Sequence, residues 1–175
     1  MSVSSKAMVF ALVKHKDQKR KYTNEPYFYH LAQVVGIVAS YAYAYPHIGL
    51  ETMLAVSWLH DSMEDQNVTS DDISNLFMDS PVQQRLDILE GIQALTNSEE
   101  GVRARRQELA CTRLSKAPGW VQTIKCADII SNLSSLPDHD PSFYRLYRLE
   151  KIANLNAMKD AHTTLRTLAF NLTTQ

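Results

Sequence analysis

One imidazole and three carboxylates lie within six residues near the middle of the chain, in the segment His60-Asp61-Ser-Met-Glu64-Asp65. Residues four apart on a helix share a face, so a helix here would present these side chains as two adjacent stripes. Four potential charges packed so closely repel one another unless a cation or a set of donors neutralises them. A divalent metal ion is the economical explanation.

Two further side chains, one on either side of this cluster in the sequence, point to the same chemistry. His30 lies on the predicted inner face of an earlier apolar segment, and Asp128 interrupts the apolar stretch 123–133. A lone carboxylate inside such a stretch is costly to bury, so Asp128 needs a partner. A site of mixed nitrogen and oxygen donors suits manganese, iron or zinc better than calcium or magnesium. The predicted metal ligands are His30, His60, Asp61 and Asp128.

The elements that must position these ligands are all predicted to be helical. Apolar residues recur at three- and four-residue spacing nearly everywhere, and no convincing alternating strand is present. Thr69 with Asp72 has the pattern of a capping box, and Ser80-Pro81 that of an N-cap followed by proline at the first helical position. The expected helices are Ser5–His15, Pro26–Tyr45, Leu50–Glu64, a short one ending near Met78, Pro81–Leu95, 99–115, Pro118–Leu136 and one or two within Ser142–Asn171.

Apolar stripes on every helix need partners, and a single bundle of about seven to eight helices around one core is the simple solution. The chain has 175 residues without an internal repeat, linker or low-complexity segment. That length fits one domain, so we expect residues 1–175 to form a single all-α domain.

The order His30, then His60-Asp61, then Asp128 resembles the His…His-Asp…Asp pattern of the HD phosphohydrolase superfamily. Within that superfamily the chain is most similar to the RelA/SpoT-type alarmone hydrolase domains and to the stand-alone small alarmone hydrolases. The resemblance covers roughly residues 5 to 150 and implies an HD-domain fold. The three segments that carry it are Lys19–His30, with Arg-Lys and Glu-Pro-Tyr; His60–Asp65, with His-Asp-x-x-Glu-Asp; and Lys125–Leu133, with Lys-x-Ala-Asp and Asn-Leu.

The resemblance also implies an activity and a set of roles. Members of the family remove the 3′-pyrophosphate from guanosine tetra- or pentaphosphate, usually with manganese. The positions that match the family's metal ligands are the four predicted above. Those that match its other functional residues are Glu64 and Asp65 (catalytic acidic pair), Arg20 and Lys21 (near the nucleotide) and Asn132 (ribose region).

Basic residues are available to hold the phosphates of such a substrate. Arg20 is the strongest candidate because a planar guanidinium binds phosphate bidentately. Arg145 and Arg148 are expected to close the pocket from the last predicted helical region, where Tyr144 or Tyr147, with which they are interleaved, would stack on the base. The basic run formed by Arg103, Arg105 and Arg106 is better interpreted as surface charge.

The other four histidines are interpreted as surface or turn residues: His15, His47, His139 and His162. The second His-Asp pair, His139-Asp140, precedes Pro141, where Asp140 is better explained as a helix cap.

The composition of the chain limits the classes of protein to which it can belong. The net charge is −1 and the calculated pI about 6.6, which argues against a general nucleic-acid binder. No run approaches the ~18 apolar residues of a membrane span, and the N-terminus is a poor signal peptide. Cys111 and Cys126 have no zinc-type spacing and are expected to be reduced thiols. We therefore expect a cytoplasmic protein with a nucleotide substrate; a homo-oligomer is compatible with the sequence.

Other functions remain open at this point. The loop between Lys21 and Glu25 is one residue longer than the common family form, which leaves the identity of the substrate open. The adenosine analogue of the alarmone, NADPH as a phosphatase substrate, and other (deoxy)nucleotides cleaved by an HD-type nucleotidase are the enzymatic alternatives. A non-catalytic module that binds a nucleotide is the alternative from another class.

Overall fold

Helices account for nearly all of the regular structure in the computed structural model, which describes residues 1–98, 100–134 and 136–174. Within these residues nine helices have seven or more residues and two have four, and the only β-type pairing is an isolated bridge between Lys19 and Pro26. The predicted all-α fold is confirmed. The elements are α1 (Val3–Lys14), α2 (Phe28–Ala39), the 3₁₀ turn η1 (Ala42–Ala44), α3 (Leu50–Leu59), α4 (Ser62–Asp65), α5 (Ser70–Leu76), α6 (Val82–Leu95), α7 (Arg103–Lys116), α8 (Gly119–Leu133), α9 (Leu136–His139), α10 (Pro141–Ala157) and α11 (Thr163–Thr173).

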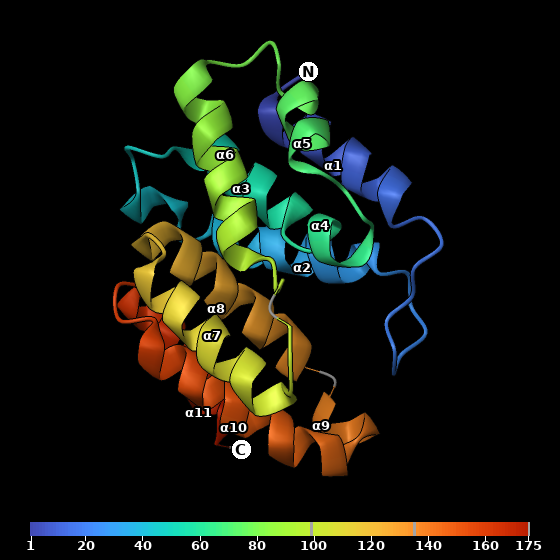
Figure 1. Ribbon diagram of the computed structural model, residues 1–175, viewed down its shortest axis with the longest axis vertical. Coiled ribbons are helices and arrows are strands. Elements are labelled where there is room, and N and C mark those ends of the chain that lie inside the picture. Colours follow the sequence, from blue (N-terminus) through green and yellow to red (C-terminus); the bar gives the residue numbers. More distant parts are fainter. Residues whose placement is uncertain (99, 135, 175) are drawn as a thin grey trace.

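Helix α8 runs between the two halves of the molecule (Figure 1). Helices α1 to α6 lie above it in that view, and α7, α10 and α11 surround its lower part. It packs against α2, α3, α6 and α11, and twelve of its fifteen residues are buried. A helix buried on all sides must be apolar nearly all round. Its charged residues, Lys125 and Asp128, therefore need partners inside the protein.

Helix α2 is shorter than the sequence predicted. The expected helix Pro26–Tyr45 begins at Phe28 and ends at Ala39, and η1 follows. The hydroxyl of Tyr45 hydrogen-bonds to the Gly119 carbonyl and to the Thr123 hydroxyl of α8. This contact holds Tyr45 away from a continued helical path, so a tertiary interaction outweighs the local periodicity.

The predicted helix Leu50–Glu64 is also wrong, because it is broken at His60 and Asp61 into α3 and α4. The His60 Nδ1 donates to the Ser57 carbonyl at 2.8 Å. In an uninterrupted helix that carbonyl would accept the amide of residue 61. The side chain replaces the backbone donor at this point, and the residues after the break point in new directions.

Helix ends are predicted well where a side chain caps them. The capping box of Thr69 and Asp72 is confirmed, and the Asp140 side chain accepts from the Phe143 amide at the start of α10. Pro81 and Pro118 are themselves the N-caps of α6 and α8, one residue earlier than the first helical position expected for Pro81. Helix α7 begins at Arg103; residues 99 and 135, within the predicted helices 99–115 and Pro118–Leu136, lie outside the described residues.

Candidate metal centre

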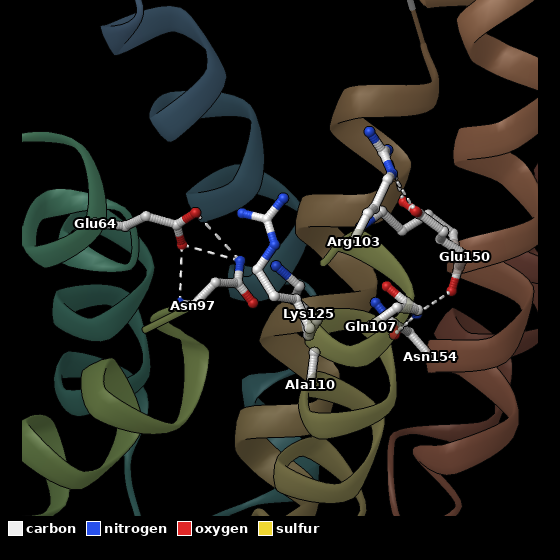
Figure 2. Close-up of a pocket in the computed structure, with 10 residues that line it drawn as sticks. Glu64, Asn97, Arg103, Gln107, Ala110, Lys125, Glu150 and Asn154 are labelled. Atoms are coloured by element: carbon white, nitrogen blue, oxygen red, sulfur yellow. Dashed lines mark hydrogen bonds and ion pairs between the residues drawn. The ribbon is translucent and has the colours of Figure 1, made fainter. Parts of the chain in front are cut away.

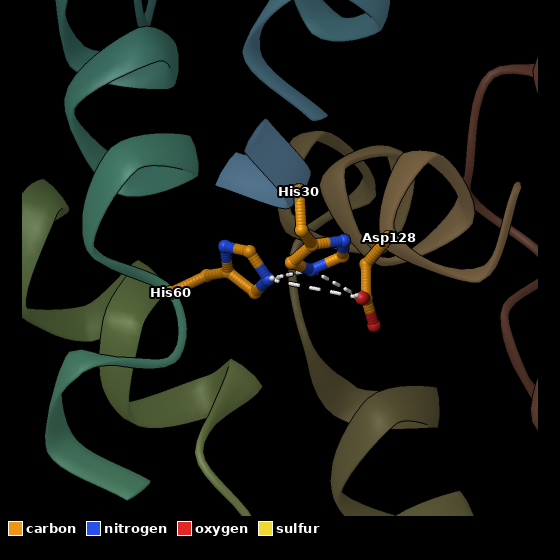
Figure 3. Close-up of side chains that lie close together, drawn as sticks. All are labelled: His30, His60 and Asp128. Atoms are coloured by element: carbon orange, nitrogen blue, oxygen red, sulfur yellow. Dashed lines mark hydrogen bonds and ion pairs between the residues drawn. The ribbon is translucent and has the colours of Figure 1, made fainter. Parts of the chain in front are cut away.

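His30, His60 and Asp128 converge on one point from three elements (Figure 3). They come from α2, from the end of α3 and from α8, and all three are buried. The Nε2 atoms of His30 and His60 are 3.3 Å apart. The Asp128 Oδ1 lies 3.3 Å from the first and 3.7 Å from the second. The sequence placed these residues 98 positions apart along the chain, and the fold brings their donor atoms within 4.8 Å of one another.

The hydrogen bonds around the two imidazoles assign their tautomers. His60 Nδ1 faces the Ser57 carbonyl, which can only accept. His30 Nδ1 lies 2.9 Å from the Ser131 hydroxyl, whose own hydrogen is donated to Gln33 Oε1 at 2.7 Å. Both rings therefore carry their hydrogen on Nδ1 and direct an Nε2 lone pair at the same point. Two facing lone pairs beside a carboxylate fit a bound cation, with the outer hydrogen bonds orienting the rings as in metal sites generally.

Asp61 lies at the edge of this group. Its Oδ2 is 2.9 Å from His60 Nε2 and 3.5 Å from His30 Nε2, and it accepts a hydrogen bond from the Tyr27 hydroxyl. Of the four predicted ligands, three share a single compact set of donor atoms, and Asp61 contacts both imidazoles beside them.

The two oxygens of Asp128 are held from opposite sides. Asn132 Nδ2 donates to Oδ1 at 2.7 Å, and the Lys125 ammonium lies 2.8 Å from Oδ2. The neighbouring cationic groups keep the pKa of Asp128 well below its usual value in spite of its burial. The carboxylate that the apolar helix α8 buries is thus ionised and fully partnered.

The electrostatics of the centre call for positive charge. Burial lowers the pKa of His60, but the nearby carboxylates Asp61 and Asp128 raise it by more, to about 10. A proton or a metal ion at the shared point would relieve the same excess of negative charge. The donor set of imidazole nitrogen and carboxylate oxygen fits a divalent transition metal.

Glu64 and Asp65 are set apart from this group by the break in the helix. Glu64 is exposed and accepts from the backbone amide of Asn97 at 2.9 Å and from its side-chain amide at 3.0 Å. Asp65 is exposed too and accepts from Gln18 Nε2 at 2.8 Å. Partial desolvation by the surrounding walls raises the pKa of each carboxyl. The expectation that the cluster forms two continuous stripes is therefore wrong.

His15 is a buried residue that the sequence interpretation placed on the surface. Its side chain stacks on Tyr27 with ring centroids 5.3 Å apart, and its nitrogens contact Gln18 and Ser62. It therefore supports the two residues that touch Asp61 and Asp65. The signal was present in α1, since Ala7, Ala11 and His15 are four apart and all buried.

A first cavity of about 240 Å³ opens beside the metal centre, and we call it the aromatic cavity. Arg20, Lys21 and Asn132, three of the residues predicted to bind the nucleotide, line it; their role in binding stays a prediction. Arg148 is not among its lining residues and has a buried Nε without a partner, so its role in binding stays a prediction. Tyr147, one of the aromatics suggested to stack on the base, also lines it, and the lining residues to which the sequence interpretation gave no role are Tyr22, Thr23, Tyr27, Leu136 and Phe143.

A second cavity of about 280 Å³ lies on the side of Lys125, and we call it the cationic cavity (Figure 2). Glu64 lines it, together with residues of α7, α8 and α10. Arg103 and Arg106 were interpreted as surface charge; both are exposed, but they form part of this wall. The complete lining is Glu64, Asn97, Arg103, Arg106, Gln107, Ala110, Lys125, Glu150, Lys151 and Asn154.

Comparison with known proteins finds relatives in sequence and a similar fold. No family model matches the chain. The GTP pyrophosphokinase rsh of Brucella melitensis is 31% identical over 136 residues, which are 75% of this chain and 16% of that protein. The guanosine-3′,5′-bis(diphosphate) 3′-pyrophosphohydrolase MESH1 of Drosophila melanogaster is 28% identical over 134 residues, 76% of this chain and 69% of that protein.

A solved structure described as "A metazoan ortholog of SpoT hydrolyzes ppGpp and plays a role in starvation responses" superposes with a TM-score of 0.81. It is 22% identical, and the match covers 99% of this chain and 94% of that one. In sequence and in fold, the chain resembles the HD-type alarmone hydrolases. The predicted resemblance and the HD-domain fold are thereby confirmed.

Two further findings concern the length of the chain relative to its relatives and the character of its helices. The chain spans about a sixth of the length of the Brucella relative, 16%. Among the described helices, none has both the length and the apolar character that crossing a membrane would require.

Proposed function

We propose that this chain is a manganese-dependent 3′-pyrophosphohydrolase of (p)ppGpp-type alarmones. The relatives named above support the reaction type. The observation that carries the proposal is the convergence of the His30 and His60 lone pairs with Asp128, between two cavities of different character. Removal of a 3′-diphosphate from a nucleotide would use a cation site together with one cavity for the nucleoside and another for the diphosphate.

The residues that would hold the metal are His30, His60, Asp61 and Asp128. Manganese accepts this mixture of imidazole and carboxylate donors, as do iron and zinc. When bound, a divalent ion would lower the pKa of water and withdraw negative charge from a phosphoryl oxygen. Tyr27 and Asn132 hold one carboxylate each, which keeps the ligand oxygens in place.

Glu64 and Asp65 are the proposed proton carriers. Both are exposed carboxyls with raised pKa values, and each is oriented by a single neighbour, Asn97 or Gln18. A raised pKa brings a carboxyl closer to the pH at which it can both accept and return a proton. One of them would take the proton from the attacking water and one would protonate the departing 3′-oxygen.

The aromatic cavity would bind the nucleoside. The rings of Tyr22, Phe143 and Tyr147 offer stacking surfaces for a base, which is the usual way proteins hold an unpaired base. The Lys21 ammonium lies 5.0 Å and 5.5 Å from the centroids of the first two rings. Arg20, which donates to the Ser131 carbonyl at 3.1 Å, would bind phosphate at the mouth of the cavity.

Product analysis over a panel of substrates tests the proposal. Metal-stripped protein is incubated with guanosine tetraphosphate, its adenosine analogue, NADPH and deoxynucleotides, with and without manganese. Manganese-dependent release of pyrophosphate and GDP from guanosine tetraphosphate is the expected result. Cleavage of deoxynucleotides alone would assign the chain to the general nucleotidases, and no metal uptake with no turnover would make it a non-catalytic module.

A further inference from the structure

The two imidazoles of the metal centre are held by partners of different kinds. His60 Nδ1 donates to the backbone carbonyl of Ser57 at 2.8 Å, and a carbonyl oxygen can only accept. His30 Nδ1 lies 2.9 Å from the Ser131 hydroxyl, which can either donate or accept. The tautomer of His60 is therefore fixed by the backbone, whereas that of His30 depends on where the Ser131 hydroxyl directs its hydrogen.

A hydrogen directed the wrong way would remove a metal donor. An imidazole that binds a metal ion is neutral and carries one ring hydrogen. If the Ser131 hydroxyl donated to His30 Nδ1, that ring hydrogen would lie on Nε2. Nε2 is the atom that faces Asp128 Oδ1 at 3.3 Å (Figure 3). A nitrogen that carries a hydrogen has no lone pair for the ion, so the centre would lose His30.

The side chain of Gln33 prevents this outcome. Its Oε1 accepts from the Ser131 hydroxyl at 2.7 Å and from the Arg20 guanidinium at 3.2 Å. A glutamine amide could turn either its oxygen or its nitrogen toward these neighbours, but a guanidinium has only donors. The atom that faces Arg20 must therefore be the oxygen. The Ser131 hydroxyl faces the same oxygen and so donates to it, which leaves its lone pair for His30 Nδ1.

The hydrogen bonds thus follow one direction, from His30 to Ser131 and from Ser131 to Gln33. Arg20 donates to Gln33 from the other side, and its second terminal nitrogen donates to the Ser131 carbonyl at 3.1 Å. A charged donor strengthens the hydrogen bonds in which it takes part. Gln33 lies on α2 one turn after His30, and Ser131 lies on α8, so the contact also joins the two helices that carry His30 and Asp128.

We infer that Gln33 is a positioning residue of the metal centre: through Ser131, its side-chain oxygen fixes His30 as a metal donor through Nε2. This inference rests on the metal site of the proposed function and adds a residue to it. Gln33 acts on the ion only through the other two residues. Its removal should therefore weaken metal binding although no ligand is changed.

The affinity of the full-length, metal-stripped chain for manganese tests this inference without any turnover. The free ion is measured by electron paramagnetic resonance at one fixed pH. Gln33→Met removes the acceptor and keeps a side chain of similar length; Gln33 is exposed, so the variant should fold, and urea denaturation checks that it does. Gln93→Met is the matched control, because Gln93 is also exposed and helical and donates to the Ser70 hydroxyl at 3.2 Å, outside both cavities.

Gln33→Met should bind manganese about 10- to 100-fold more weakly than the unaltered chain, the usual cost of losing a partner behind a metal ligand. Gln93→Met should bind it as the unaltered chain does. Gln33→Glu should bind it at least as tightly, because a carboxylate accepts from both neighbours. Ser131→Ala should weaken binding to a similar degree, and the double variant Gln33→Met/Ser131→Ala should lose no more, since both residues act in one chain of hydrogen bonds.

Equal affinities of Gln33→Met and Gln93→Met would overturn the inference, as would a Gln33→Glu variant as weak as Gln33→Met. Absence of manganese binding by the unaltered chain would overturn it together with the proposed metal site. If manganese binding depends on Gln33 but guanosine tetraphosphate is not hydrolysed, the inference stands and the proposed function falls. Hydrolysis with an affinity that does not depend on Gln33 removes the inference alone.

Discussion

The aromatic cavity and the cationic cavity are each lined by one residue that contacts Asp128, Asn132 in the first and Lys125 in the second, yet their walls differ in nearly every property. One presents the rings of Tyr22, Phe143 and Tyr147, and the other presents a cluster of amides with Arg106 and Lys151, which form no ion pair among the described residues. Aromatic surface gains from covering a flat base, whereas unpaired ammonium and guanidinium groups gain from phosphate. Under the proposed function, the contrast gives the metal centre a nucleoside side and a phosphate side, and the bond that would be cleaved lies between them.

The largest expected effect comes from Asp128, which contacts one lining residue of each cavity, Lys125 and Asn132. Asp128→Asn should remove a ligand and the partner of Lys125 and Asn132, so activity should fall by more than about 100-fold. Phosphate release and metal content by mass spectrometry are measured together, with Asp87→Asn in α6, whose carboxylate accepts from Gln83, as the control. Full metal content with normal turnover would contradict the assignment of Asp128 as a metal ligand.

Glu64→Gln should separate proton transfer from metal binding. Loss of a general acid or base costs about 10²- to 10⁴-fold in rate, and the metal content should stay unchanged because Glu64 contacts Asn97 rather than the ligands. The rate constant kcat and bound metal are compared with those of Glu108→Gln. A variant that loses its metal would place Glu64 among the ligands instead.

Arg20→Gln should affect the nucleoside side alone. We expect KM for guanosine tetraphosphate to rise about tenfold, since a bidentate phosphate contact is lost. The affinity for inorganic pyrophosphate should not change, because Arg20 lines only the aromatic cavity. Arg105→Gln is the control, because Arg105 is exposed, pairs with Glu108 and lines neither cavity. A parallel loss of pyrophosphate binding would show that the two cavities act as one.

The pH dependence of pyrophosphate binding should reveal Lys151 on the phosphate side. Its pKa is lowered to about 8, so its positive charge is present below that pH and is lost above it. The other charged groups facing it are Lys125, Glu150, Glu64 and Asp128. The advantage of the unaltered chain over Lys151→Met should therefore be largest near pH 7 and shrink as the pH rises through about 8. Calorimetry at several pH values measures it; a constant advantage would remove Lys151 from the site.

The smallest effect is expected from a substitution away from both cavities, which should lower stability without changing the choice of substrate. Thr69→Ala breaks the capping box of α5 and should lower the free energy of unfolding by about 1 kcal/mol. Urea denaturation measures the loss. The preference for diphosphate over monophosphate substrates should stay the same, and a change in it would show that substrate choice follows overall stability.

Much of the metal centre could be predicted because its ligands carry their own signals. Asp128 is conspicuous as a carboxylate in an apolar helix, and the His60-Asp61 pair ends an apolar stretch. The break at Asp61 could not be seen, because the His60 side chain competes with the backbone only once the fold fixes it against Ser57. The spacing of apolar residues, from which the helix was predicted, gives no information about that competition.

The cationic cavity could not be predicted from the sequence, for a different reason. The sequence around Arg106 is typical of a charged, solvent-exposed helix, and Lys151 lies 45 residues later in α10. The two residues line one cavity only because α7 packs against α10 in the folded protein. His15 marks the opposite case, since its four-residue spacing from Ala7 and Ala11 was visible in the sequence and pointed to burial.

The measurement that tests the central claim most directly is the ³¹P NMR spectrum of guanosine tetraphosphate after incubation with the manganese-loaded protein. If the metal centre lies between a nucleoside cavity and a phosphate cavity, the products are GDP and intact pyrophosphate. Release of single inorganic phosphate, with one phosphate left on the 3′-oxygen, would mean that cleavage occurs elsewhere in the diphosphate and would contradict the account.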